Sequence, residues 1–140
     1  MDMNIVDMNV ANLVLPISIL YAGLLGVLMV PMTLNVALYR VKNRIALGDG
    51  ADDTLIRRMR AHGNFIETVP FALLLIVLVE LSGGSAGLIH GLGITLVVGR
   101  LLHYVTILKN PILPTRAIGM VATLGVILTA AVWLLLAYLG

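Results

Sequence analysis

The sequence predicts an all-α integral membrane protein built as a bundle of four helices. Of its 140 residues, 60% are hydrophobic and only 11% are charged, and the mean hydropathy is +1.06. A soluble domain of this length is typically about half apolar and about a quarter charged. Four apolar stretches are long enough to cross roughly 30 Å of hydrocarbon, which takes about 20 helical residues. Lipid offers no hydrogen-bond partners, so each stretch must satisfy its own backbone groups and is expected to form a helix. A chain of this length has room for a single domain.

The four expected spans follow one another along the chain. They cover residues of about 11–39, 64–81, 86–108 and 117–139. The first contains Pro16 and Pro31, which bend a helix or mark its ends. The short link between the third and fourth spans is stiffened by Pro111 and Pro114.

The connection between the first two spans is long and polar. Within it, Gly48-Asp49-Gly50 predicts a turn. Asp52 or Asp53 can cap a helix that starts before the membrane and continues into the second span. The connection between the second and third spans, residues 82–85, is instead a tight uncharged turn. Residues 1–9 lack the basic start of a secretory signal, so we expect them in the mature protein.

Basic residues are concentrated in alternate connections. The first loop holds Arg40, Lys42, Arg44, Arg57, Arg58 and Arg60, and the third holds Lys109 and Arg116. The residues before the first span, the second loop and the end of the chain hold none. The positive-inside rule therefore predicts that loops one and three are cytoplasmic and that both termini face the other side. The membrane topology explains the excess of basic over acidic residues, so no nucleic-acid partner is expected.

Five ionisable side chains fall inside the predicted spans. They are Glu67, Glu80, His90, Arg100 and His103. Such residues are costly in lipid and usually face a bundle interior or a wet cavity. At 1.5 Å per residue, Glu67 lies about 10 Å and Arg100 about 12 Å from the cytoplasmic side, so we expect these two to pair. Asn64 and His103, at about 6 and 8 Å, form a second layer.

Spacing groups the polar residues on common helix faces. The second helix has a 3-4-3 pattern made by Arg57, Arg60, Asn64 and Glu67. On the third helix, Arg100 and His103 are three residues apart and again share a face. Arg40 ends the first span and Arg116 begins the fourth, both at the same side of the membrane. Together these residues predict a cationic pocket for an anionic, carboxylate-bearing or peptide-like ligand.

Other interpretations of the same residues remain open. Glu67 and Arg100 also suit a purely structural pair, and the cations of the first loop suit topology or lipid headgroup contacts. Glu80 and His90 lie near the opposite interface and are expected to extend to it. His62, just outside the membrane, is expected to be solvated. The sequence has no cysteine, which excludes disulfides and a cysteine nucleophile, and no metal site is expected.

The segment Arg60-Ala61-His62-Gly63-Asn64-Phe65-Ile66-Glu67-Thr68-Val69-Pro70-Phe71 closely resembles the signature of the MAPEG superfamily, the membrane-associated proteins in eicosanoid and glutathione metabolism. That signature is Arg-Ala-x-x-Asn-x-x-Glu followed by a proline. Residues 98–103 resemble the family's third-helix segment, and residues 114–116 resemble the link before its fourth helix. Tyr39-Arg40 and Gly48-Asp49-Gly50 are similar to the small bacterial inner-membrane branch. The resemblance spans about residues 40–116.

The resemblance implies a homotrimer in a bacterial inner membrane, with three pockets between subunits. In catalytic members each pocket holds glutathione, and hydrophobic substrates enter from the lipid. The candidate glutathione-binding residues are Arg40, Arg60, Asn64, Glu67, Arg100 and His103. Arg116 is the candidate catalytic residue, because a cation beside a thiol of pKa about 8.5 favours the nucleophilic thiolate.

Three positions depart from the pattern of catalytic relatives. Ile107 stands where they commonly carry a tyrosine, Ala117 where some have a serine, and Met120 where another tyrosine often lies. Tyr104 is nearby but lies about 100° around the helix from His103. Glutathione binding is therefore better supported by the sequence than turnover.

Three functions follow as hypotheses. The first is a glutathione transferase or peroxidase that acts on hydrophobic electrophiles. The second is a membrane protein that binds glutathione or lipid, or acts as a scaffold, without catalysis. The third is a small multidrug-type transporter, which the intramembrane Glu67 motivates. Those transporters carry their essential carboxylate on the first helix, whereas Glu67 lies on the second.

Overall fold

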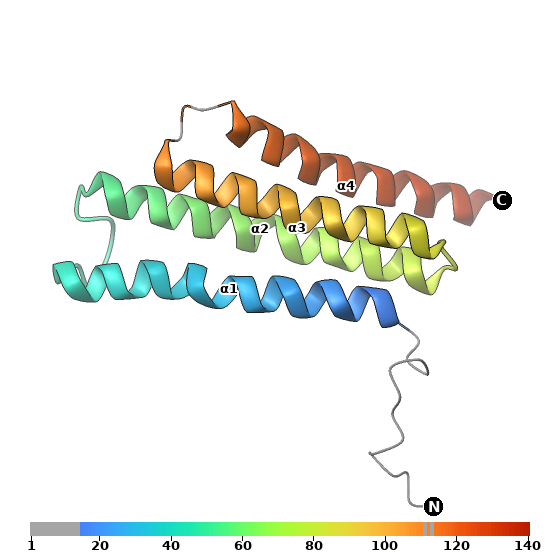
Figure 1. Cartoon of the computed structure of the whole chain (residues 1–140), viewed down its shortest axis with the longest axis horizontal. Coiled ribbons are helices and arrows are strands. Elements are labelled where there is room, and N and C mark those ends of the chain that lie inside the picture. Colours follow the sequence, from blue (N-terminus) through green and yellow to red (C-terminus); the bar gives the residue numbers. More distant parts are fainter. Residues whose placement is uncertain (1–14, 111, 113) are drawn as a thin grey trace, which may run out of the picture.

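The computed structural model describes residues 15–110, 112 and 114–140, which form four helices lying side by side. The helices are α1 (Pro16–Asn43), α2 (Asp53–Leu81), α3 (Ala86–Lys109) and α4 (Thr115–Leu139). Figure 1 shows α2 and α3 in the middle, with α1 and α4 on opposite sides of them. The predicted all-α, four-helix architecture is confirmed. The N-terminal residues, including 11–14 of the expected first span, lie outside the described part.

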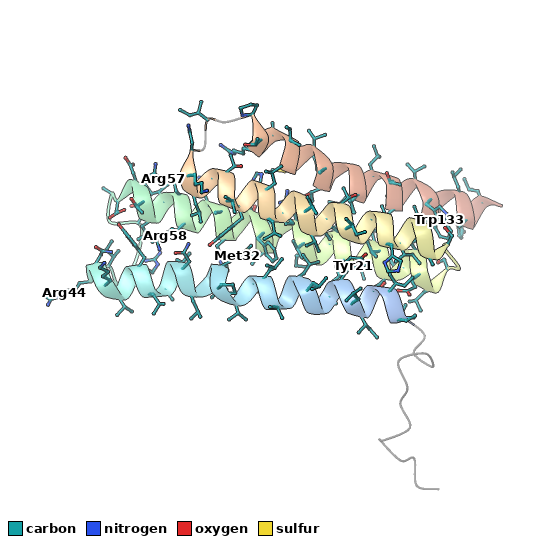
Figure 2. All side chains as sticks on the ribbon, viewed as in Figure 1. Tyr21, Met32, Arg44, Arg57, Arg58 and Trp133 are labelled. Carbon is teal, nitrogen blue, oxygen red and sulfur yellow. The ribbon has the colours of Figure 1, made fainter. Side chains whose placement is uncertain are left out.

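Consecutive helices run in opposite directions, so each end of the bundle collects two helix starts and two helix ends (Figure 1). One end carries Arg44, Arg57 and Arg58, and we call it the basic end. Figure 2 shows these arginines far from Tyr21 and Trp133, which mark the opposite end. The segregation of arginines at one end agrees with the charge pattern of the loops.

All four helices are long and apolar enough to cross a membrane, with mean hydropathies of 1.6 to 2.4 over their most apolar windows. Their outer faces expose large apolar side chains, such as Val27 on α1 (72% exposed) and Leu128 on α4 (66% exposed). Exposed apolar area on this scale marks a surface that meets lipid or another subunit. Buried apolar residues of all four helices form the core between them, including Leu25, Phe65, Leu96 and Val126.

Helix α2 begins at Asp53, well before the expected span, because Asp52 caps it. The Asp52 carboxylate accepts a hydrogen bond from the backbone N–H of Leu55 at 2.8 Å, which satisfies one of the free donors of the first turn. It also accepts from the Tyr39 hydroxyl at 3.0 and 3.2 Å. The cap therefore ties the start of α2 to the end of α1.

We expect Asp52 to make stability at the basic end depend on pH. The Leu55 N–H is the largest cause that lowers the Asp52 pKa below its ordinary value of 3.8. A group whose pKa is lower in the folded state stabilises the protein fully above its unfolded pKa, and this contribution is lost as the pH falls through the folded pKa. The melting temperature of the detergent-purified protein should therefore fall on acidification below about pH 4, and it should fall less steeply in Asp52→Asn.

The neighbouring Asp53→Asn is the matched control, because this substitution removes the same charge from an exposed position. Its melting temperature should follow the wild-type pH profile. Identical acid slopes for wild type and Asp52→Asn would contradict the assignment of this cap.

Helices α3 and α4 are in close contact where two glycines meet. A Cβ atom on Gly119 would lie 2.7 Å from the carbonyl oxygen of Gly99 and 2.8 Å from the Cβ of His103. The absence of a side chain at Gly119 thus allows backbone contact between the helices. Shortly before Gly119 in the chain, the carbonyl oxygen of Arg116 accepts a hydrogen bond from the Nδ1–H of His103 at 3.0 Å. This contact fixes the start of α4 against α3.

At the opposite end, Glu80 does not extend to the membrane interface as expected. Its carboxylate accepts hydrogen bonds from the backbone N–H groups of Ile17 at 3.0 Å and Ser18 at 2.7 Å. These donors in the first turn of α1 have no partner within their own helix. Tyr21 bonds there through its hydroxyl to His90 Nδ1 at 2.9 Å. Glu80 therefore acts as a cap for α1 supplied by α2.

His62 keeps part of its expected exposure and also contacts α1. The Thr33 hydroxyl donates to the carbonyl oxygen of Met29 at 3.0 Å, so its oxygen is available to accept from His62 Nε2, which lies 3.0 Å away. The half-buried His62 therefore connects α2 to α1.

Candidate functional site

A hollow of about 700 Å³ lies at the basic end, with walls from α2, α3, the start of α4 and the loop before α2. Its lining residues are Asp49, Ile56, Arg57, Met59, Arg60, Gly63, Asn64, Glu67, His103, Ile107 and Arg116. We call it the basic hollow. The positions on α2 recur every three or four residues, so the hollow follows one face of that helix. Its size lies within the range of about 300–1,000 Å³ that is common for small-molecule sites.

The structure brings together five of the seven residues that the sequence proposed for the site. They are Arg60, Asn64, Glu67, His103 and Arg116. Arg40 and Arg100 do not line the hollow. Arg40 lies alongside it on α1, where its Nη2 contacts the sulfur of Met59 at 3.1 Å. Arg100 lies behind the wall and is only 1% exposed.

Arg100 connects three helices through its guanidinium. Its Nη1 donates to Asn64 Oδ1 at 2.6 Å and to Thr68 Oγ1 at 3.1 Å, and its Nη2 donates to the carbonyl oxygen of Gly119 at 2.8 Å. Within the described residues, Glu67 is not among its hydrogen-bond partners. The expected Glu67–Arg100 pair is therefore replaced by contacts to neutral acceptors. Arg100 faces the contact of α2 with α4, whereas Glu67 is exposed and faces the hollow.

The contact between Arg100 and Asn64 determines which atoms the hollow offers to a ligand. A guanidinium only donates hydrogen bonds, so the Asn64 atom that faces Arg100 must be its oxygen. The Nδ2 group of Asn64, with two N–H donors, is then directed away from Arg100. Because Asn64 lines the hollow, these donors are available to a carbonyl or carboxylate oxygen there. Arg100 is thus a positioning residue that acts through Asn64.

The lining carries charges of both signs. Arg57, Arg60 and Arg116 supply permanent positive charge, and Glu67 and Asp49 supply carboxylates. This combination suits a zwitterionic ligand that has carboxylates and an ammonium group. Arginine also forms two parallel hydrogen bonds to a carboxylate, which fixes the orientation of such a ligand.

Asp49 was not predicted as a site residue, because its sequence context indicates only a turn. Its side chain accepts from the Ala51 N–H at 2.9 Å, and its carbonyl oxygen accepts from the Asp52 N–H at 3.1 Å. Positive φ angles at Gly48, Gly50 and Ala51 turn the chain sharply here. The loop is thereby folded back so that Asp49 reaches the hollow.

The hollow offers few hydroxyl groups. Among the described residues that line it there is no tyrosine, serine or threonine, and Ile107 occupies the position one turn beyond His103. Tyr104 is directed to the other side of α3, where its hydroxyl accepts from Asn35 Nδ2 on α1 at 2.9 Å. Its predicted direction away from His103 agrees with this contact. The described residues also contain no cluster of three acidic, histidine or cysteine side chains that could hold a metal ion.

A comparison with protein families decides the family. The MAPEG family model matches residues 18–136, which is most of the chain and all four helices. This chain belongs to the MAPEG family.

Two curated relatives of this MAPEG protein are inner membrane proteins. The inner membrane protein YecN of Escherichia coli strain K12 is 38% identical over 88 residues, which cover 63% of this chain and 67% of the relative. The protein of the same name from Escherichia coli O6:H1 strain CFT073 matches to the same extent. No solved structure matches the chain. The four apolar helices and these relatives together identify a membrane protein of the bacterial inner-membrane type.

Proposed function

We propose that this MAPEG protein is a homotrimer of the bacterial inner membrane that binds glutathione in the basic hollow. The basic end faces the cytoplasm in this proposal, in accordance with the positive-inside rule. The observation that carries the proposal is the gathering of Arg60, Asn64, Glu67 and Arg116 around one hollow. Glutathione has two carboxylates, one ammonium, two amides and a thiol, and the lining has a complementary group for each kind.

Individual roles follow from the chemistry of each side chain. Arg60 pairs with a carboxylate, and Glu67 accepts from the ammonium group. The outward N–H groups of Asn64 donate to an amide carbonyl of the tripeptide. His103 uses Nδ1 for the Arg116 carbonyl, which leaves Nε2 to contact the ligand. Arg116 lies beside the thiol.

The exposure of the charged residues supports an oligomer. Glu67 and Arg60 are exposed on the single chain, although they belong to a helix that is apolar enough to span a membrane. Ionisable side chains in contact with lipid are costly, so we infer that another subunit covers this face and completes the hollow. Homo-oligomers of soluble proteins mostly close by rotational symmetry, and the proposed trimer is a closed arrangement of the same kind. Arg40, beside its own hollow, is proposed to contact glutathione at such an interface.

Turnover is the further part of the proposal. The positive charge of Arg116 stabilises the glutathione thiolate, which forms when the thiol releases its proton to water. The thiolate sulfur attacks an electrophilic carbon of a hydrophobic substrate that arrives from the lipid. As the C–S bond forms, the bond from that carbon to a leaving group such as a halide breaks, and the leaving group departs with the electron pair. Ile107 favours a second candidate, a protein that binds glutathione or lipid without catalysis, because an aliphatic side chain donates no hydrogen bond to a thiolate.

Binding and conjugation measured together test both candidates. Calorimetry with the purified protein should show glutathione binding, and a general electrophile should be conjugated. Arg116→Ala should lower kcat/KM by about a hundredfold, which is the usual effect of removing one electrostatic stabiliser. Lys109→Ala, which removes a charge from the end of α3 outside the hollow, is the matched control. Glutathione binding without conjugation would support the second candidate. An absence of glutathione binding would refute the transferase and would leave the second candidate only as a lipid-binding protein.

A further inference from the structure

A second, smaller hollow lies on the other side of Arg57 from the basic hollow. Its volume is about 140 Å³, and it is lined by Asn35 of α1, Thr54, Arg57 and Arg58 of α2, and Leu108 of α3. We call it the arginine crevice. Every one of these residues is half-buried, so the crevice is recessed between the three helices. Arg57 lines both hollows, and the proposed glutathione site uses none of the other four residues.

Arg58 is held in the crevice by neighbours on α1. Its Nη1 donates to both the backbone carbonyl oxygen and the Oδ1 of Asn35. Its guanidinium carbon lies 4.3 Å from the centroid of the Tyr39 ring. Asn35 is fixed in turn, because its Nδ2 donates to the Tyr104 hydroxyl. The guanidinium is therefore ordered before any ligand binds.

The hydrogen bonds of Arg58 use only one of its three nitrogens. In the described part of the chain, Nε and Nη2 have no hydrogen-bond partner. Together with Arg57 and the Thr54 hydroxyl, these donors are suited to an anion with several oxygens. Thr54 also lies in the first turn of α2, where the helix dipole favours negative charge. The chemistry of the crevice is that of a phosphate site.

Size restricts the ligand further. The volume of the crevice, about 140 Å³, is one fifth of the 700 Å³ of the basic hollow. That is enough for a phosphate group and too little for a tripeptide. The crevice is therefore distinct in ligand as well as in place from the basic hollow.

The surroundings favour a lipid as the source of this phosphate. The crevice lies at the ends of three membrane-spanning helices, and Figure 2 shows Arg57 and Arg58 at this end of the bundle. Leu108 forms one apolar wall, and Leu38, three residues after Asn35 on α1, is 62% exposed. We propose that the arginine crevice binds the phosphate of an anionic phospholipid, whose acyl chains extend along this exposed face of α1.

Native mass spectrometry of the detergent-purified protein tests the proposal. Phosphatidylglycerol should bind at one tight site per chain, and phosphatidylcholine with the same acyl chains should bind more weakly. Arg58→Gln should weaken phosphatidylglycerol binding about tenfold, which corresponds to one charge-assisted contact. Lys42→Gln removes the same charge from an exposed position near the end of α1 and should leave the affinity unchanged. An equal loss of phosphatidylglycerol affinity in Arg58→Gln and Lys42→Gln would overturn the proposal.

A second variant and a competitor complete the design. Arg58→Gln also removes a contact to α1, whereas Thr54→Val keeps it and should still weaken lipid binding by several-fold. Wild type and Thr54→Val should have similar melting temperatures without lipid, and phosphatidylglycerol should raise that of wild type more. An unchanged affinity in Thr54→Val would count against the crevice. Displacement of the lipid by equimolar glycerol 3-phosphate would show a site for free phosphate and would also overturn the proposal.

Discussion

Replacing Arg100 with methionine is expected to lower the free energy of unfolding by roughly 2–4 kcal/mol, because buried acceptors then lose a charged donor. Asn64 Oδ1 and Thr68 Oγ1 lose the Nη1 group, and in the described part of the chain no other donor reaches Asn64 Oδ1. The Gly119 carbonyl oxygen is less affected, since the Thr123 hydroxyl still donates to it at 3.1 Å. Glutathione affinity should fall as well, because the Asn64 amide is then free to turn.

A double-mutant cycle separates these effects. Asn64→Leu removes the acceptor to which Arg100 donates. In chemical unfolding of the detergent-purified protein, the losses of unfolding free energy caused by Arg100→Met and by Asn64→Leu should therefore add to clearly more than the loss in the double variant. Arg60→Met is the matched control, since this exposed arginine should affect glutathione affinity and leave stability nearly unchanged. Additive losses in the cycle would show that Arg100 does not act through Asn64.

Gly119→Ala is expected to destabilise the protein by about 1–3 kcal/mol, which is typical of overpacking at a close contact. The added methyl group would meet the Gly99 carbonyl oxygen at 2.7 Å and the His103 backbone nitrogen at 2.9 Å. These are backbone atoms of α3, so no flexible side chain can move aside. The start of α4 must shift instead, and Arg116 would move relative to His103. Both the melting temperature and glutathione affinity should therefore decrease.

Gly125→Ala on the same helix is the control for this prediction. A Cβ atom there would have no neighbour within 4 Å. Because alanine favours helix by about 1 kcal/mol over glycine, this variant should be as stable as wild type or slightly more stable. Similar melting temperatures for the two variants would contradict the close crossing of α3 and α4 at Gly119.

The polar face of α2 was predictable because helix periodicity is a local property. Once residues 57–67 form a helix, their spacing places Arg60, Asn64 and Glu67 on one side. The N-cap of α2 was predictable as Asp52 or Asp53 for the same reason, since a capping residue lies next to the turn that it caps, and the structure selects Asp52. Both features needed no knowledge of how the helices pack.

The partners of Arg100 were not predictable in this way. The rise per residue gives the depth of Glu67 and Arg100, and depth alone suggested a pair. Which face of α3 meets α2 and α4 depends on the close contact of Gly99 with Gly119, which is a tertiary feature. Glu80 was misjudged for a related reason. Its partners are N–H groups of α1, more than 60 residues earlier in the chain, and no local pattern indicates them.

A cryo-electron microscopy structure of the protein in lipid nanodiscs with saturating glutathione tests the central claim most directly. We expect three copies around one axis and one glutathione in each basic hollow. The Asn64 Nδ2 group should donate to the tripeptide, and the thiol should lie beside Arg116. Empty hollows at saturating glutathione, or a monomer with Glu67 facing lipid, would contradict the proposed function.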